Sequence, residues 1–222
     1  MLIPADILNV PLFKGLSRSE IEKFVNFTGT TFKTYPRGER ILEAYKPNAN
    51  IGILVTGEAQ ILSLDWLGNE TVGHVIDSGA IFGTVSAILG EDLIATSVRL
   101  TTEATVMWIP YRSLLIAGPN LGRTHGVVMK NLLETFSRKN VLMMQKVELL
   151  SQKTLRERVI LYLIQHEKRQ ESEWVKVPGR VQFAKELECN RSALTREISQ
   201  MQAQGLVEVD GHLMKLNKDK IS

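Results

Sequence analysis

Apolar positions in the C-terminal third of the chain follow two successive helical patterns with a short break between them. The first pattern comprises Phe183, Ala184 and Leu187, and the second comprises Leu194, Ile198 and Met201. Each set falls on one face of a helix with 3.6 residues per turn. Asn190 stands where its side chain can cap the second helix by accepting from the first free N–H groups. The pattern predicts two short helices joined by a tight turn.

The polar face of the second predicted helix carries two arginines and two hydroxyl residues. These are Arg191, Ser192, Thr195 and Arg196. In a helix-turn-helix, residues near the start of the second helix meet base edges in the major groove of DNA. The planar guanidinium of arginine can donate to two acceptors of guanine at once. The stretch therefore favours DNA binding, and an ordinary amphipathic helix pair with a solvated basic face is the alternative.

Residues 206–209 and 212–216 alternate between apolar and polar side chains around Asp210-Gly211. Asp-Gly between alternating runs is a strong signal for a β-hairpin with a two-residue turn. A hairpin directly after a helix-turn-helix makes a winged helix. His212 and Lys215 are then candidate phosphate contacts from the wing, or simply exposed hairpin residues.

Residues 31–110 change to a period of two. Short alternating runs such as residues 51–55, 59–63 and 104–109 are separated by turns rich in glycine. Many short strands at this spacing predict a β-barrel or a β-sandwich. Ahead of them, Ser17 and Glu20 have the spacing of a capping box at the start of a helix. The fold class is thus α+β, with a β-barrel or β-sandwich preceding the helical segments; the family resemblance described below makes this β-domain an antiparallel, jelly-roll-like β-roll.

Residues 121–150 keep a seven-residue repeat of apolar positions, typical of a helix that pairs with another helix. The expected dimer interface is Met129, Leu133, Phe136, Asn140, Met143, Val147 and Leu150. Asn140 takes an interior position, where an asparagine costs stability but favours a two-stranded register. The alternative is a long helix that packs on its own β-domain. Further apolar positions lie outside this seam, at Val128, Leu132 and Val141, which suggests that the helix makes both contacts.

Charge is unevenly distributed along the chain. Residues 117–222 carry an excess of six positive charges, whereas residues 1–116 carry an excess of three negative charges. Basic character confined to the half with the helix-turn-helix suits phosphate binding. The single cysteine, Cys189, rules out an internal disulfide. No apolar run approaches the ~20 residues of a membrane span and no signal-peptide pattern is present, so we expect a cytoplasmic protein without membrane contact.

Several short motifs resemble one known family. They are residues 53–57 (ILVTG), 68–70 (GNE) and 79–83 (GAIFG), followed by the strand at residues 95–99. Residues 31–110 resemble the β-roll sensor domain of the Crp/Fnr family of bacterial transcription regulators, and the C-terminal stretch resembles its winged helix. The resemblance implies a phosphate contact for Arg180 and base contacts for Arg191 and Arg196. It also implies a sensor domain at 1–116, a dimerisation helix at 117–150 and a DNA-binding domain at 151–222.

The resemblance also places the effector pocket, at Gly83, Thr84, Val85, Ile94, Ala95, Met143 and Met144. Family members that bind cyclic AMP hold its phosphate with an Arg-Ser pair and its ribose with a glutamate after the glycine of the FG motif. This chain has Ile94-Ala95 and Thr84 there. Burying a phosphate without a cation would cost several kcal/mol, roughly. We expect an uncharged or hydrophobic effector, or a pocket filled by its own side chains. A haem sensor using His74 or His125 is a further alternative, but we expect no cofactor and no metal.

The sequence therefore predicts a homodimeric regulator that binds a palindromic operator in double-stranded DNA. RNA polymerase is a further candidate partner. The alternative is a ligand-binding regulatory subunit whose helix-turn-helix contacts protein. We find no HExxH, GxSxG or phosphate-loop motif, and expect no enzyme activity and no catalytic residue.

Overall fold

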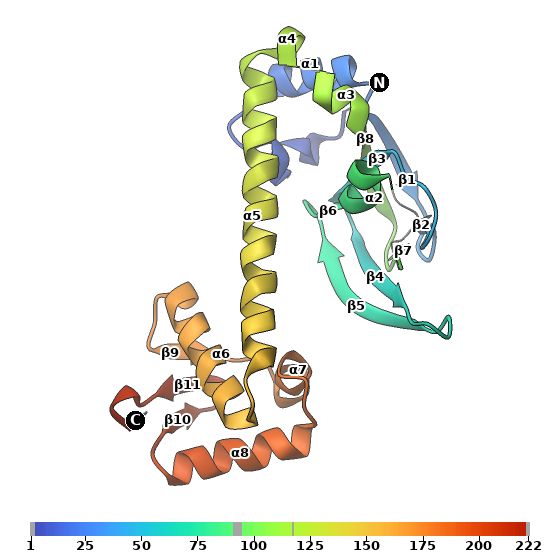
Figure 1. The fold of residues 1–222 in the computed structure, drawn as a ribbon. Coiled ribbons are helices and arrows are strands. Elements are labelled where there is room, and N and C mark those ends of the chain that lie inside the picture. Colours follow the sequence, from blue (N-terminus) through green and yellow to red (C-terminus); the bar gives the residue numbers. More distant parts are fainter. Residues whose placement is uncertain (1–2, 91–94, 117, 221–222) are drawn as a thin grey trace. The chain divides into compact units, whose positions relative to one another are not determined.

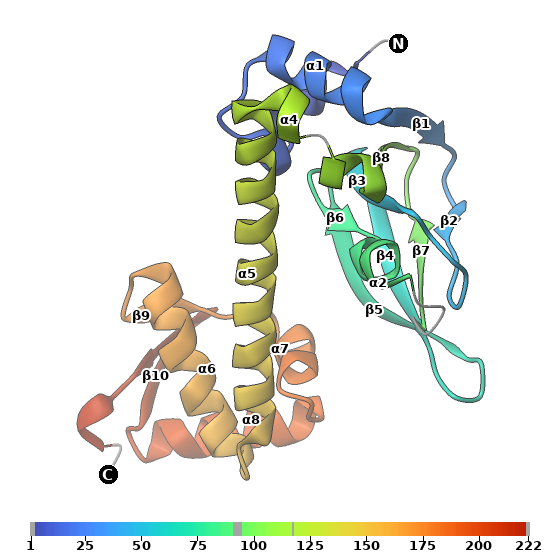
Figure 2. The ribbon, with the colours of Figure 1, turned by 45° about the horizontal axis from the view of Figure 1, so that its top comes forward.

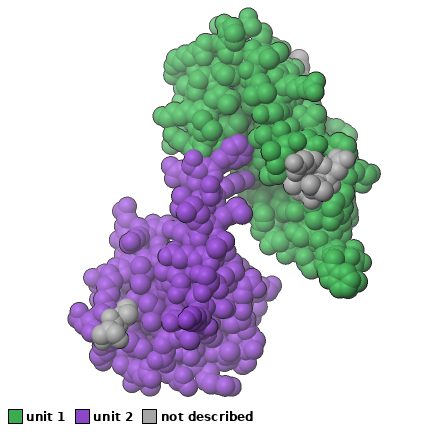
Figure 3. All heavy atoms as spheres, in the orientation of Figure 1, with its two compact units in different colours: residues 1–135 green, residues 136–222 purple. Residues whose placement is uncertain are grey.

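A computed structural model describes residues 3–90, 95–116 and 118–220. The chain forms two compact units, Met1–Thr135 and Phe136–Ser222, coloured green and purple in Figure 3. Helix α5 (Arg123–Ser151) begins in the first unit and ends in the second. The sequence-based boundaries at residues 116 and 150 stay a prediction. No described helix has both the length and the apolar character that crossing a membrane requires.

The first unit begins with two short 3₁₀ helices, Ala5–Asn9 and Pro11–Phe13, and helix α1 (Arg18–Thr28). The predicted capping box is confirmed. The Ser17 amide donates to the Glu20 carboxylate at 2.8 Å, and the Glu20 amide donates to the Ser17 hydroxyl at 3.4 Å. These two bonds satisfy N–H groups that the first helical turn leaves free. The hydrogen bonds and the neighbouring Arg123 keep the pKa of Glu20 below its ordinary value.

Two four-stranded antiparallel sheets form the β-roll (Figures 1 and 2). One has the order β1 (Thr31–Tyr35), β8 (Ala104–Pro110), β3 (Asn50–Thr56) and β6 (Ile81–Phe82). The other has the order β2 (Arg40–Leu42), β7 (Thr96–Leu100), β4 (Glu58–Leu64) and β5 (Glu70–Asp77). The short helices are α2 (Thr84–Leu89), α3 (Tyr111–Ile116) and α4 (Gly118–Leu121). The predicted β-roll is thus present.

The apolar alternation of these strands builds a core between them. Leu54, Val98 and Val106 are among its buried side chains. The turn between β3 and β4 needs a glycine, because Gly57 has a φ of +91° and a Cβ there would lie 2.6 Å from the Glu103 carbonyl oxygen. Only glycine adopts such a conformation without strain.

Ser97 on β7 is fully buried, and its hydroxyl lacks a hydrogen-bond partner within the described part of the chain. A buried polar group without a partner costs ~1–3 kcal/mol. Ser97→Ala should therefore leave the free energy of unfolding unchanged or raise it by ~1 kcal/mol, measured by urea denaturation of the full chain.

The matched control for Ser97 is a buried hydroxyl that is bonded. The Thr28 hydroxyl donates to the Phe24 carbonyl at 2.8 Å, so Thr28→Val should lower the free energy of unfolding by ~1 kcal/mol. A loss in Ser97→Ala as large as that in Thr28→Val would show that the Ser97 hydroxyl does stabilise the fold.

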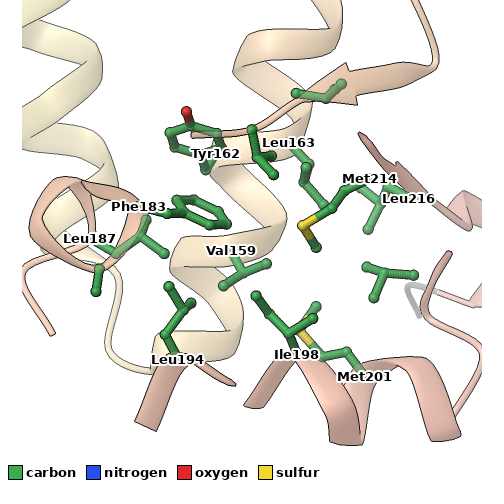
Figure 4. Close-up of a cluster of buried hydrophobic side chains, with 14 of the residues drawn as sticks. Val159, Tyr162, Leu163, Phe183, Leu187, Leu194, Ile198, Met201, Met214 and Leu216 are labelled. Atoms are coloured by element: carbon green, nitrogen blue, oxygen red, sulfur yellow. The ribbon is translucent and has the colours of Figure 1, made fainter. Parts of the chain in front are cut away.

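The second unit contains the winged helix. Its elements are α6 (Leu155–Gln170), β9 (Trp174–Lys176), α7 (Arg180–Glu186), α8 (Arg191–Ala203), β10 (Val207–Asp210), β11 (Leu213–Leu216) and the 3₁₀ helix Lys218–Lys220. The sheet order is β10-β11-β9. Side chains from α6, α7, α8 and β11 converge on one core (Figure 4), with Val159, Phe183 and Ile198 among those almost wholly buried. This packing fixes α8 against the rest of the unit.

The wing is present, but its turn lies one residue later than predicted. Asp210 pairs with Leu213, so the two turn residues are Gly211 and His212 rather than Asp210 and Gly211. Gly211 has a φ of +55°. A glycine at the first central position is what a type II′ hairpin turn demands. The requirement for positive φ at that single position therefore sets the register.

Candidate nucleic-acid interface and effector pocket

Helix α8 is held at its start by Asn190, as predicted. The Asn190 side-chain oxygen accepts from the Ala193 amide at 2.8 Å. Leu194, Ile198 and Met201 are buried on the inner face. The inner face and the cap together fix which side of α8 meets solvent.

The solvent side of α8 brings four of the predicted DNA-binding residues together. Arg191, Ser192, Thr195 and Arg196 are all exposed and line one shallow depression. The Ser192 hydroxyl donates to the Asn190 oxygen at 2.9 Å, and the Thr195 hydroxyl donates to the Arg191 carbonyl at 2.9 Å. Neither arginine forms an ion pair with another described residue. The two guanidinium groups are therefore the main hydrogen-bond donors that this face offers.

Contacts from other elements hold α7 and α8 in place, and no sequence pattern predicts these contacts. Arg156 on α6 donates to the Glu197 carboxylate on α8 at 2.7 Å. Arg158 donates to the Leu187 carbonyl, in the turn between α7 and α8, at 3.1 Å. The partners lie 41 and 29 residues apart, so no local spacing could reveal them. They restrain the arginine-bearing helix relative to α6.

The remaining predicted DNA contacts lie outside the depression. Arg180 starts α7 and is half-buried, with Nη1 4.0 Å from the Met214 sulfur, and burial lowers the pKa of Arg180. His212 is exposed in the wing turn. Lys215 forms an ion pair with Glu173 at 2.7 Å, which raises the pKa of Lys215 and offsets its charge. Lys215 is thus less available to phosphate than Arg191 or Arg196.

The predicted effector residues are only partly brought together. Gly83, Thr84 and Val85 line a cavity of about 100 Å³ in the β-roll, with side chains from β2, β4 and β7. Ala95 is half-buried but does not line this cavity, and Ile94 lies outside the described residues. Met143 and Met144 belong to the second unit, where both are exposed. Their predicted role in the pocket stays a prediction.

Asn48 is a pocket residue that the sequence reasoning missed. Its amide donates to the Asn50 carbonyl at 2.6 Å and to the Gly83 carbonyl at 3.0 Å. These bonds hold the start of α2 against β3. The charged pair at the same cavity, Lys46 and Glu43, is joined at 2.5 Å, so the lysine already has a counter-ion.

Comparisons with known proteins agree with the fold described above. Residues 32–116 match the family model for the cyclic nucleotide-binding domain. The fold is similar to that of the Thermus thermophilus catabolite activator protein, with 19% identity, a TM-score of 0.55 and 94% of each chain covered. It is also similar to the c-di-GMP responsive global regulator CLP of Xanthomonas campestris, with 19% identity, a TM-score of 0.56, and 90% of this chain and 99% of that chain covered.

A third similar structure is CprK complexed with OCPA, with 10% identity, a TM-score of 0.61, and 87% of this chain and 89% of that chain covered. The chain has the Crp/Fnr regulator fold. A search of curated protein sequences gave no significant match.

In this Crp/Fnr fold, helix α5 presents much of the predicted seam to solvent. Leu133, Met143 and Val147 are 59%, 69% and 68% exposed, and Asn140 is exposed as well. Met129, Phe136 and Leu150 are half-buried. Other apolar positions of α5, outside this seam, are buried: Val128 and Leu132 in the first unit and Leu149 in the second. The seam residues thus form an apolar stripe that a single chain leaves in water.

The two candidate haem ligands lie on different elements. His125, on α5, places Nε2 3.0 Å from the Leu114 carbonyl oxygen, so this ring nitrogen is already used. His74 lies on β5. Among the described residues, no three histidine, cysteine or acidic side chains gather as metal ligands.

Proposed function

We propose that the chain is a homodimeric, sequence-specific DNA-binding transcription regulator of the Crp/Fnr type. The observation that carries this proposal is the solvent face of α8. Arg191 and Arg196 project from it beside Thr195, on a helix that the core, the Asn190 cap and the Arg156 contact hold in place. A fixed helix with free arginines is the arrangement that reads guanine in the major groove.

The exposed stripe of α5 supports the homodimer. Large apolar side chains exposed together at heptad spacing are unfavourable in water, and pairing with a second copy would bury them. Two copies joined in parallel along this helix would carry two α8 helices. Half-sites read by such a pair lie one DNA turn apart, ~34 Å, which matches a palindromic operator.

The β-roll cavity supports an effector other than cyclic AMP, or none. At about 100 Å³ the cavity is smaller than the ~300–1,000 Å³ of typical ligand pockets. Lys46 brings a positive charge to its lining, but Glu43 pairs with it. A buried phosphate would therefore lack the uncompensated cation that it needs.

Millimolar cyclic AMP should change neither the melting temperature of the protein nor its affinity for DNA, because the site cannot neutralise the phosphate charge. Differential scanning fluorimetry and fluorescence anisotropy with a labelled operator measure the two quantities. The control is cyclic AMP added to the labelled operator without protein. A saturable rise of several degrees in the melting temperature would show that the site does accept the nucleotide.

Selection of bound sequences from random duplex DNA tests the proposed function itself. We expect enrichment of an inverted repeat, with affinity that falls steeply as salt increases because lysine and arginine release counterions from phosphate. Failure of any sequence to outcompete random DNA at several salt concentrations would overturn the proposal. It would favour the alternative, a regulatory subunit that acts through protein contacts.

A further inference from the structure

A cleft of about 550 Å³ lies wholly within the second unit, between α5, α6 and residues 176–178, which comprise the end of β9 and the two residues after it. Its volume falls in the ~300–1,000 Å³ range of small-molecule sites. Helix α5 contributes Leu142, Gln145, Lys146 and Leu149 to the lining. None of these four belongs to the proposed dimer seam. The cleft therefore uses a different face of α5 from the one that would pair with a second copy.

One wall of the cleft is built from aromatic rings. Tyr162 packs against Phe183 in the core, with ring centroids 4.7 Å apart. On the cleft side, the His166 ring stacks on Tyr162, with centroids 3.8 Å apart and an interplanar angle of 15°. Val177 and Pro178 add apolar surface. A flat apolar group would find complementary surface here.

The His166 ring offers this cleft a hydrogen-bond acceptor. His166 Nδ1 lies 2.9 Å from the Tyr162 carbonyl oxygen, and a carbonyl can only accept, so Nδ1 carries the hydrogen. Burial lowers the pKa of His166, which favours the neutral ring at pH 7. In that form Nε2 has a free lone pair. A ligand with an O–H or N–H group can donate to it.

The charged groups of the lining favour an anion. Lys146, Arg169 and Lys176 carry positive charge, against the one carboxylate of Glu186. Burial raises the pKa of Tyr162, and the neighbouring Glu186 carboxylate raises it further. That carboxylate already accepts a hydrogen bond from the Gln182 side-chain amide at 3.2 Å.

The cations are only partly used by the protein. Arg169 donates to the Gln145 side-chain oxygen at 2.6 Å, which uses one of its five N–H groups. Lys146 donates to the Glu186 carbonyl and lies 3.9 Å from the Glu188 carboxylate. Lys176 forms no ion pair with any described residue. The cleft thus has an excess of positive charge beside an aromatic wall.

We propose that this cleft binds a small organic anion with a flat apolar body. The anionic group would meet Arg169 and Lys176, the body would lie against the His166–Tyr162 wall, and a donor group would meet His166 Nε2. The proposal does not depend on DNA binding, because the site consists only of side chains within the second unit.

Isothermal titration calorimetry of the full chain with benzoate, 4-hydroxybenzoate and phenyl phosphate tests the proposal. We expect saturable binding of at least one of these anions, with one site per chain. Benzamide, which has the same ring but no charge, should bind at least tenfold more weakly than benzoate. Lack of saturable binding by all three anions, or equal affinity for benzamide, would overturn the proposal.

Two neighbouring substitutions on α6 locate the site. Arg169→Gln should weaken binding at least tenfold, because it removes a cation from the lining. Lys168→Gln removes an equal charge from an exposed position that does not line the cleft, and it should leave binding unchanged. Circular dichroism checks that both variants fold. Equal losses in the two variants, or no loss in Arg169→Gln, would show that the anion binds elsewhere.

Discussion

Replacing Arg191 and Arg196 together by alanine will abolish sequence-specific DNA binding and leave the oligomeric state unchanged. Each arginine that reads a guanine contributes ~1–3 kcal/mol of discrimination. Loss of both should therefore weaken operator binding by ~2–6 kcal/mol, or ~30-fold to ~20,000-fold. Fluorescence anisotropy with an operator and with a scrambled duplex measures the loss. Both side chains are exposed, so the fold should be retained.

The control for this double variant removes two exposed arginines from the other unit. Arg37→Ala with Arg112→Ala changes the net charge by the same amount, and both residues lie in Met1–Thr135. This control should keep its preference for the operator. If the two double variants lost equal affinity, overall charge rather than α8 would carry recognition, and the proposed readout would be wrong.

Val147→Lys will convert the proposed dimer to a monomer. Val147 is 68% exposed in the single chain and takes an interior position of the proposed seam, where two lysines would face each other across the two-fold axis. Burying like charges without partners is strongly unfavourable. We expect the dissociation constant of the dimer to rise by ~100-fold or more, equal to ~3 kcal/mol, measured by sedimentation equilibrium. Operator affinity should fall with it.

Val141→Lys is the matched control for the dimer. It introduces the same side chain in place of the same residue, also exposed (53%) on α5, but outside the heptad seam. This variant should remain a dimer. A dimer that survived Val147→Lys, or one that was lost equally in both variants, would contradict the assigned interface.

Local patterns were sufficient to predict most of the fold. The capping box at Ser17 and Glu20, the cap at Asn190 and the apolar stripe of α8 depend on neighbours within four residues, and the structure confirms them. The wing turn was misplaced by one residue because Asp-Gly and Gly-His are both compatible with a two-residue turn. The pairing of Asp210 with Leu213 selects the second.

The sites depend on contacts between distant segments, which explains why parts of them could not be predicted from the sequence. Asn48 reaches Gly83 across 35 residues. The cleft beside α6 joins residues from 142 to 186. No periodicity or motif in the sequence indicates either the Asn48 contact or the cleft. Arg191 and Arg196 could be predicted because they lie on one face of a single helix, although their role in reading DNA remains a proposal.

The stoichiometry and footprint on a selected operator test the central claim most directly. Sedimentation velocity and hydroxyl-radical footprinting on one duplex should find two chains bound to two inverted half-sites, centred one DNA turn (~34 Å) apart. A single chain bound to one unrepeated site would contradict the claim that paired α5 helices aim two arginine-bearing helices at DNA.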